Sequence, residues 1–351
     1  MSYSVRVVPG GDFSKAVDIW GMAFGFSQEW KERSFRYANE RLSTLLGAYE
    51  GDELQALAGI IDFELHLGDL WIPCGGICAV ATRPPHRRRN VVNVLLRECL
   101  KGLHARRVPV SSLWPFSYPF YQRMGWATTD MKYSIESDLA PLRRCGDSRG
   151  YKQHPVTDIQ VLMPLHERWV ERSNLSIKRT AERWDWLLTR PELDCNVFVH
   201  QDGYMVWNLK KREGVLEVKE WAYLTEEAFL DGLTLLSQMD SQYRKAQWVS
   251  SEIDLLNRLG TSDPIATINV IPGMMSRVVH VDAFRELLPM KSPALPIRDS
   301  LGVSGPPDES GYDPGELVQL VTGFWRNPPS HLPVELNAVL AGQQAFSGEY
   351  F

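Results

Sequence analysis

Hydrophobic and polar residues alternate along the chain in patterns that switch repeatedly between those of strands and those of helices. Residues 3–8 alternate with a period of two, as an edge strand does. From Ala16 to Phe24 the apolar residues return at helical spacing, after Asp12 and Ser14, which are typical of a helix start. In chain order we predict a strand over 3–8, helices over 12–24 and 29–41, and strands over 44–50, 54–66 and 70–82.

A long amphipathic helix follows these strands, over about 88–106. Its apolar residues lie at positions i, i+3, i+4 and i+7, which places them on one face: Val92, Leu95, Leu96, Cys99, Leu100 and Leu103. A strand over 109–113, a short helix over 117–124 and a strand over 126–136 complete this unit. Because helices alternate with strands, the sequence predicts an α/β (mixed α+β sheet) fold and not a bundle or a sandwich.

Two changes of composition divide the rest of the chain. Residues 139–155 are polar and contain Pro141, Gly146 and Gly150, which favours a boundary. A second α/β unit follows, with predicted helices over 156–172, 178–190 and 225–239 and strands over 195–201, 203–211, 214–223 and 245–251. From about 265 the pattern changes again, to a strand and helix within 274–289, a loop over 291–313 and a capped helix that starts at Asp313. We predict domains at 1–140, 150–262 and 263–351.

Composition and charge narrow the classes of function. The chain has 351 residues and a net charge of −5, which argues against general binding to nucleic acid or to an anionic membrane. No apolar segment approaches the roughly 20 residues that a membrane-spanning helix needs, and no signal peptide is evident. The 5 cysteines form no CxxC pair and no metal-ligand spacing, so we expect reduced thiols, no metal site and a cytoplasmic protein.

Residues 75–126 contain the segment that points most directly to chemistry. A basic turn, from His86 to Arg89, lies between an apolar strand and the amphipathic helix. A helix N-terminus offers several N–H donors and a favourable dipole, so this turn predicts a cradle for a pyrophosphate. The residues alone also allow a solvated basic turn or a nucleic-acid patch, and the acidic balance of the chain disfavours the patch. The chain contains no competing GxxxxGK[ST], HExxH or GxSxG motif.

This order of strand, basic turn, helix, strand and aromatic turn resembles the acetyl-CoA site of the GNAT acyltransferases, and within them the multi-domain Eis type. The family pattern Arg/Gln-x-x-Gly-x-Gly/Ala is met by Arg87, whereas Asn90 and Val92 replace the two small residues. Asn is among the non-glycine residues that best tolerate a positive φ. The resemblance implies tandem GNAT-like domains, followed by a sterol-carrier-like domain that is shorter than usual between 295 and 313. The second GNAT-like domain has no basic turn comparable to His86–Arg89, so we expect it to bind no cofactor.

The resemblance also assigns contacts to acetyl-CoA residue by residue. It implies that the backbone of strand 70–82 pairs with the pantetheine arm, which requires this strand to separate from its neighbour. It implies that the turn and the first helical residues hold the phosphates. The implied contacts are Val80, Ala81, Thr82, Arg87, Arg88, Arg89, Asn90, Val91, Val92, Asn93, Phe116 and Ser117.

Two residues are candidates for proton transfer. Tyr121 matches the general-acid tyrosine of the family, and a tyrosine with a pKa of about 10 is protonated at neutral pH. From the residues alone, packing within the aromatic turn is the alternative for Tyr121. Eis-type chains commonly end in an aromatic segment whose carboxylate accepts the proton of the amine, which would here be Phe351; a frayed terminus is the alternative.

The acceptor is predicted to lie near the two N-terminal helices. Trp20, Phe24, Trp30 and Phe35 are candidates for its pocket, with core packing as the alternative for each. We predict an acetyl-CoA-dependent N-acetyltransferase that acts on a primary amine of a small molecule or on a lysine. The alternatives are a non-catalytic acyl-CoA-binding or regulatory protein, and a biosynthetic acyltransferase that uses another acyl group or a hydroxyl acceptor. The resemblance also implies a homo-oligomer, commonly a hexamer, and the charge of the chain predicts no nucleic-acid or membrane partner.

Overall fold

The chain forms two compact units, seen here in a computed structural model. Unit 1 comprises Met1–Thr129, Met274–Gly342 and Glu349–Phe351, and unit 2 comprises Asp130–Gly273 and Gln343–Gly348. The residues that the structure describes are 3–25, 44–188, 194–209, 214–251, 265–288, 295–307, 310–325, 327–333, 336 and 346.

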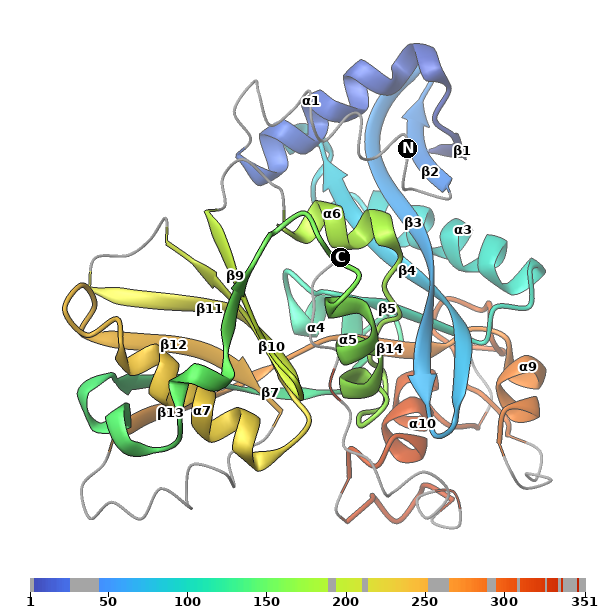
Figure 1. Ribbon diagram of the computed structural model, residues 1–351. Coiled ribbons are helices and arrows are strands. Elements are labelled where there is room, and N and C mark those ends of the chain that lie inside the picture. Colours follow the sequence, from blue (N-terminus) through green and yellow to red (C-terminus); the bar gives the residue numbers. More distant parts are fainter. Residues whose placement is uncertain are drawn as a thin grey trace. The chain divides into compact units, whose positions relative to one another are not determined.

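The sheet of unit 1 consists mainly of strands from the N-terminal part of the chain (Figure 1). The apolar runs of its two longest strands form one hairpin, paired from Leu67↔Leu70 to Ala56↔Thr82. The strands predicted over 44–50 and 70–82 have the observed bounds. The order across the sheet is β1 (Ser4–Val7), β2 (Thr44–Glu50), β3 (Glu53–Leu67), β4 (Leu70–Thr82), β5 (Val110–Leu113), β14 (Met275–Val278) and β6 (Ala127–Thr128).

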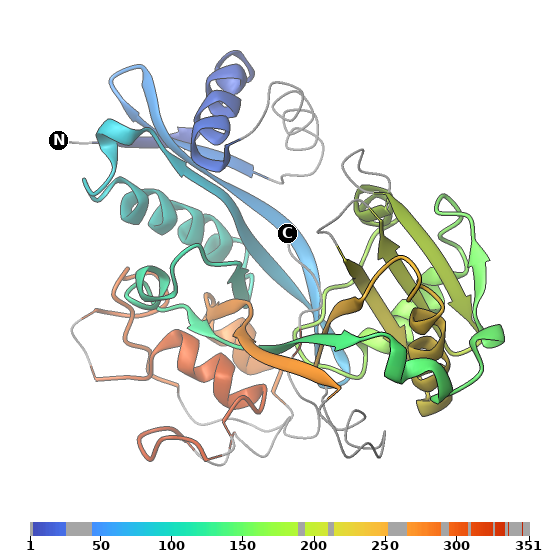
Figure 2. The ribbon, with the colours of Figure 1, turned by 90° about the vertical axis from the view of Figure 1, so that its left-hand side faces the viewer.

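Two amphipathic helices cover opposite faces of this sheet (Figure 2). Helix α1 (Phe13–Phe24) packs in a cluster that contains Leu57 of β3. Helix α3 (Val91–Ala105) packs in a cluster that contains Ala56 and Ala58. Because successive residues of a strand point to opposite faces, β3 supplies both clusters. The predicted apolar stripe of α3 is confirmed, since Leu95, Leu96, Cys99, Leu100 and Leu103 are fully buried.

A later part of the chain completes the sheet of unit 1. Strand β14 lies between β5 and β6 and is antiparallel to both, with Met275 opposite Leu113 and Thr128. The other described α-helices of this unit are α4 (Tyr118–Gln122), α9 (Val281–Glu286) and α10 (Pro314–Val321). Asp313 caps α10 as predicted, because its side chain accepts hydrogen bonds from the first turn. The three-domain division, with a sterol-carrier-like region over 263–351, stays a prediction.

Unit 2 is built on a second mixed sheet. Strands β11 and β12 are parallel neighbours, and α7 (Glu226–Ser237) connects them. Helix α7 buries Phe229 against Trp221, with ring centroids 4.9 Å apart. The order across this sheet is β13 (Ala266–Pro272), β7 (Met131–Asp138), β12 (Lys245–Ser250), β11 (Val215–Tyr223), β10 (Gly203–Asn208), β9 (Cys195–His200) and β8 (Lys152–His154).

Shorter helices complete the described elements. Unit 2 also contains α5 (Leu162–Val170) and α6 (Ala181–Leu188). The 3-10 helices are η1 (Gly10–Asp12), η2 (Pro84–His86), η3 (Ala140–Arg144) and η4 (Ser148–Gly150). No helix in the described ranges combines the length and the apolar character needed to cross a membrane.

Some predicted elements differ from the observed ones. The strand predicted over 126–136 is two strands, β6 and β7, because the chain leaves unit 1 for unit 2 at residues 129–130. Strands β8 and β13 were not predicted. Only 3 residues form β8, and β13 lies at an edge with most of its residues exposed, so neither has a strong apolar pattern. The helix predicted over 29–41 lies outside the described residues.

Candidate active site

A bulge in β4 forms one side of the candidate site. The register of β4 against β3 shifts between Leu57 and Gly59. As a result, Ala79 and Val80 lie opposite the single residue Ala58. Ala79 has a φ of 52°, in the left-handed region that non-glycine residues rarely adopt. A bulge of this kind bends the strand and interrupts its regular pairing.

Beyond the bulge, one edge of β4 is open. The pairing of β4 with the parallel strand β5 ends at Ile77↔Leu113, whereas β4 continues to Thr82. Within the described ranges no strand pairs with this edge of β4 at residues 78–82. Backbone groups on such an edge can pair with an extended ligand.

Trp20 supports the bulge from α1. Its indole Nε1–H donates to the carbonyl oxygen of Ala79 at 2.7 Å, and its ring packs edge-on against Phe13. The side chain is 3% exposed and does not belong to the described lining of the pocket reported below. The sequence offers Trp20 as a candidate for the acceptor pocket, with core packing as the alternative. In the structure Trp20 packs in the core. A buried indole N–H needs a hydrogen-bond partner, and the carbonyl of Ala79 at the bulge provides it.

The N-terminus of α3 forms the opposite side of the site. Asn90, at the N-cap position, has φ 62° and ψ 6°, and its side chain makes no capping hydrogen bond. Its Oδ1 instead accepts a hydrogen bond from Nδ2 of Asn93 at 2.6 Å. The N–H groups of Val91 and Val92 have no acceptor inside the helix, because a helix start leaves its first donors unsatisfied. These donors and the helix dipole together favour an anion.

The basic turn before α3 holds two arginines at the site. Arg88 has a φ of 62°, and the Nε of Arg87 donates to the carbonyl of Thr82 at 3.5 Å. A left-handed arginine costs about 1–2 kcal/mol, a cost that is typical of segments held in shape for binding. Arg87 and Arg88 line the pocket, and Arg89 is not among its described lining residues.

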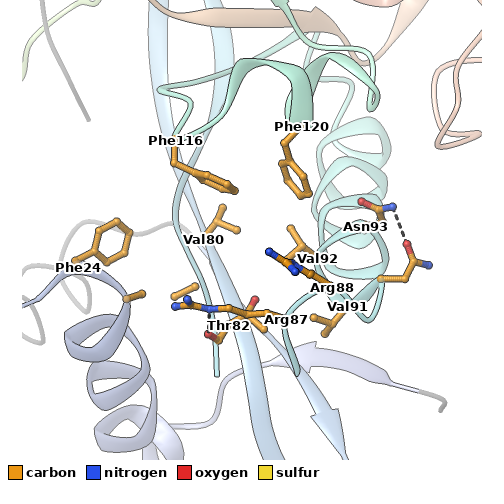
Figure 3. A pocket seen from close by; sticks show the side chains of 13 residues that line it. Phe24, Val80, Thr82, Arg87, Arg88, Val91, Val92, Asn93, Phe116 and Phe120 are labelled. Atoms are coloured by element: carbon orange, nitrogen blue, oxygen red, sulfur yellow. Dashed lines mark hydrogen bonds between the residues drawn. The ribbon is translucent and has the colours of Figure 1, made fainter. Parts of the chain in front are cut away.

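These elements surround a pocket of about 660 Å³ (Figure 3). Figure 3 shows Phe116 and Phe120 toward one end of it, Thr82 and Arg87 toward the other, and Val80 between them. The pocket is apolar along β4 and the aromatic turn and basic at the helix start, which suits a ligand with an extended arm and an anionic group. It is lined by Ala23, Phe24, Val80, Ala81, Thr82, Arg87, Arg88, Asn90, Val91, Val92, Asn93, Phe116 and Phe120.

Tyr121 lies in α4, next to the aromatic residues of the pocket. Its ring packs edge-on against Phe116 and Phe120, with centroids 5.3 and 5.1 Å away, and against Trp126 at 6.0 Å. The side chain is 2% exposed, and this burial raises the pKa of Tyr121 well above its usual range. Tyr121 itself is not among the described lining residues. It adjoins the pocket through its contacts with Phe116 and Phe120, which do line it.

Of the other site residues predicted from the sequence, some line the pocket and others do not. Phe24, at the end of α1, is 52% exposed and lines the pocket. Ser117 precedes α4 as its N-cap residue and does not belong to the described lining. The predicted sites at Trp30, Phe35 and Phe351 lie outside the described residues.

The sequence did not single out two of the lining residues, Ala23 and Phe120. Phe120 follows Phe116 by four residues in the same aromatic turn, with ring centroids 5.3 Å apart, and this cluster of aromatic residues is a signal that could have identified it. Ala23 has no chemical signal of its own. Where the structure describes the chain, no three His, Cys, Asp or Glu side chains come together as a metal site.

Two acetyltransferase family models match the chain. Residues 4–129 match one model described as an acetyltransferase (GNAT) domain, and residues 175–278 match a second model with the same description. The N-acetyltransferase Eis of Mycobacterium tuberculosis (strain ATCC 25177 / H37Ra) is 26% identical over 257 residues, which cover 68% of this chain. The match spans 64% of the length of that relative.

Solved structures share this fold over the full chain. A probable N-acyltransferase from Enterococcus faecalis V583 superposes with a TM-score of 0.82 at 22% identity, and the match covers 100% of both chains. Eis1 from Mycobacterium abscessus superposes with a TM-score of 0.75 at 18% identity, again over 100% of both chains. At these identities the likeness concerns the fold.

Proposed function

This chain belongs to the GNAT acetyltransferases and carries two GNAT domains, and on that premise we propose that its first domain transfers an acetyl group from acetyl-CoA to a primary amine. The acceptor in this proposal is an amine of a small molecule or of a lysine side chain. The observation that carries the proposal is the pocket of unit 1. An uncapped helix N-terminus, two arginines and an open strand edge contribute to this one cavity.

The pocket has the chemistry that CoA requires. Acetyl-CoA, when bound, supplies a reactive thioester at the end of its pantetheine arm. We assign its pyrophosphate to the N–H groups of Val91 and Val92 and to the guanidinium groups of Arg87 and Arg88, because both kinds of donor bind phosphates well. We assign its pantetheine amides to the open backbone edge at residues 80–82.

Tyr121 in this proposal donates a hydrogen bond to the departing sulfur. Its raised pKa keeps the hydroxyl protonated at neutral pH, so the donor is present where the enzyme works. A thiol has an ordinary pKa of about 8.5, below that of a tyrosine, so complete proton transfer from Tyr121 to the thiolate is uphill. The hydrogen bond is therefore its larger contribution.

The acceptor amine must lose a proton before or during attack. A lysine-like amine has a pKa of about 10.4, so on the order of 10⁻³ of it or less is neutral at pH 7. The role of the Phe351 carboxylate as proton acceptor stays a prediction. Phe346 belongs to unit 2, where its N–H donates to the carbonyl of Asn174 at 2.9 Å and its carbonyl accepts from the hydroxyl of Ser176 at 2.7 Å.

Calorimetric titration with acetyl-CoA, followed by thiol release with a panel of amines, tests the activity. We expect binding, and thiol release with at least one amine. Absence of acetyl-CoA binding would contradict the proposal. Binding without release for any amine or alcohol would favour a non-catalytic acyl-CoA-binding protein, and release with alcohols alone would favour a hydroxyl acceptor.

A Tyr121→Phe variant tests the role of the tyrosine. It is expected to keep the acetyl-CoA affinity and to lose about 10²-fold in kcat, as is usual when one hydrogen-bond donor to a developing negative charge is removed. The matched control is Tyr118→Phe, a partly buried tyrosine of the same short helix, for which we expect a kcat close to that of the parent. Equal kcat values for Tyr121→Phe and the parent would remove Tyr121 from the mechanism.

A further inference from the structure

A wholly buried ion pair contacts the loop that follows Tyr121. Arg277 of β14 and Asp299 are both 0% exposed, and the Nη2 of Arg277 donates to the Oδ2 of Asp299 at 2.6 Å. These two residues lie far along the chain from the predicted site and belong to the part of unit 1 that completes the sheet. Neither has a role in the acetyl transfer described above.

Arg277 reaches the backbone and the ring of this loop. Its Nη1 donates to the carbonyl of Met124, and its guanidinium carbon lies 5.0 Å from the centre of the Trp126 ring. The N–H groups of Met124 and Trp126 in turn donate to the carbonyl of Tyr121, at 2.9 and 3.2 Å. The Trp126 ring packs edge-on against the ring of Tyr121. Arg277 is therefore one residue removed from Tyr121 through both the backbone and the aromatic contacts.

Gly125 makes this contact close. It has a φ of 81°, and a Cβ placed there would lie 3.1 Å from the Nη1 of Arg277 and 2.8 Å from the Cγ of Pro314. The turn after α4 thus fits against Arg277 with no space for a side chain. A movement of the guanidinium group would be transmitted directly to the turn.

Asp299 fixes Arg277 and a second segment at the same time. Its carboxylate accepts hydrogen bonds from the N–H groups of Leu301, Val303 and Ser304, at distances from 2.9 to 3.1 Å. The neighbouring Ser300 hydroxyl donates to the carbonyl of Arg123 at 2.9 Å. The segment 299–304 therefore holds the loop 123–126 through Arg277 and through Ser300.

Because buried ion pairs add little net stability, the pair of Arg277 and Asp299 is better explained by the orientation that it gives to its neighbours. The cost of removing two charges from water often cancels their attraction, so an apolar pair of the same size is commonly as stable. What a buried arginine with hydrogen bonds from all three of its nitrogens supplies is a fixed orientation of the groups that it contacts. Here the groups that it contacts are those that hold Tyr121.

We propose that Arg277 and Asp299 are positioning residues, which hold the loop 123–126 and thereby keep the Tyr121 hydroxyl aligned for acetyl transfer. This inference rests on the proposed role of Tyr121. A displacement of about 1 Å at a reacting group can reduce a rate by about 10²-fold, so a small rearrangement of this loop is enough to matter.

A double-mutant cycle with Arg277→Lys and Tyr121→Phe tests the proposal. Lys retains the charge beside Asp299 but lacks the planar fork that reaches Met124 and Asp299 together. We expect Arg277→Lys to lower kcat by about tenfold or more with little change in the KM for acetyl-CoA. In the Tyr121→Phe background, the same substitution should change kcat by less than about twofold, because the aligned hydroxyl is already absent.

The outcomes separate the two proposals. Equal losses from Arg277→Lys in both backgrounds would show that the pair acts on structure in general and would overturn the positioning role. An unchanged kcat for Arg277→Lys would overturn it as well. If Tyr121→Phe alone leaves kcat unchanged, the role of Tyr121 fails first, and the positioning proposal falls with it.

Two further variants keep the test informative if Arg277→Lys folds poorly. Ser300→Ala removes only the exposed hydrogen bond to Arg123, and we expect a smaller loss of kcat that also disappears in the Tyr121→Phe background. An equal loss in both backgrounds would count against the proposal. Arg106→Lys is the matched control, because Arg106 makes a bidentate pair with Asp62 in the same unit away from the loop. Its kcat should equal that of the parent, and a loss as large as that of Arg277→Lys would overturn the specific role.

Discussion

In both units a helix connects two parallel neighbouring strands, but the two helices begin in opposite ways. Helix α3 begins at Asn90, whose side chain caps nothing, directly after a basic turn. Helix α7 begins at Thr225, whose hydroxyl oxygen accepts a hydrogen bond from the N–H of Ala228 at 3.2 Å. Glu226 and Glu227 occupy the first turn of α7. One helix start is left open to an anion, whereas the other caps one of its own N–H donors and carries acidic residues that complement its dipole.

This difference teaches that the fold alone does not decide where a cofactor binds. Strand order and helix placement are alike around α3 and α7, so the topology offers two equivalent positions. The capacity to hold a phosphate depends on a few residues at the start of each helix. Three changes at these residues test the comparison.

The largest effect is expected from reversing the charge of the α3 start. The double variant Arg87→Glu with Arg88→Glu replaces two phosphate donors by two repelling carboxylates in the pocket. Because a charge-assisted hydrogen bond contributes about 1.5–3 kcal/mol, the Kd for acetyl-CoA should rise by at least about 100-fold. Isothermal titration calorimetry measures it. The control is Arg97→Glu, an exposed residue of the same helix; a comparable weakening there would mean that net charge and not the cradle determines affinity.

An intermediate effect is expected at Asn90. Asn90→Gly retains access to the observed φ of 62°, whereas Asn90→Ala strains it by about 1 kcal/mol. The Ala variant should bind acetyl-CoA about fivefold more weakly than the Gly variant, since 1.4 kcal/mol is about tenfold. Both lose the contact with Asn93, so they control for each other. Equal Kd values would show that the left-handed conformation of this residue is not required.

The smallest effect is expected at the start of α7. Thr225→Ala removes the capping hydrogen bond and should lower the free energy of unfolding by about 1 kcal/mol, measured by urea denaturation. The affinity for acetyl-CoA should not change. Thr225→Ser keeps the capping oxygen and is expected to retain the stability of the parent. A change in acetyl-CoA affinity on removing this cap would indicate that the two helix starts are coupled.

Local features of the fold were predictable, and long-range ones were not. The buried apolar stripe on α3 and the extents of strands β2 and β4 follow from the pattern of apolar residues within single segments. The sequence therefore identifies them correctly. The cap of α10 at Asp313 is similarly local. The insertion of β14 between β5 and β6 depends on pairing between residues more than a hundred positions apart, and no local pattern encodes it.

The candidate site follows the same division. The basic turn and the open helix start could be recognised from consecutive residues. The bulge at Ala79, the left-handed Arg88 and the hydrogen bond from Trp20 to the bulge could not, because each is a compromise imposed by packing between separate elements. Arg277 and Asp299 are also beyond sequence reasoning, since their pairing exists only once distant segments have met.

The position of β14 has a consequence for folding during synthesis on the ribosome. Strands β5 and β6 are synthesised early. The strand that lies between them and pairs with both, Met275–Val278, is synthesised much later. At synthesis rates of about 5–20 residues per second, the nascent first sheet therefore waits for a time on the order of ten seconds with unpaired strand edges. During that interval all of β7 to β13 emerges, so the second unit has the opportunity to fold before the first is closed. The strand that completes the sheet of unit 1 is thus synthesised after the described strands of unit 2.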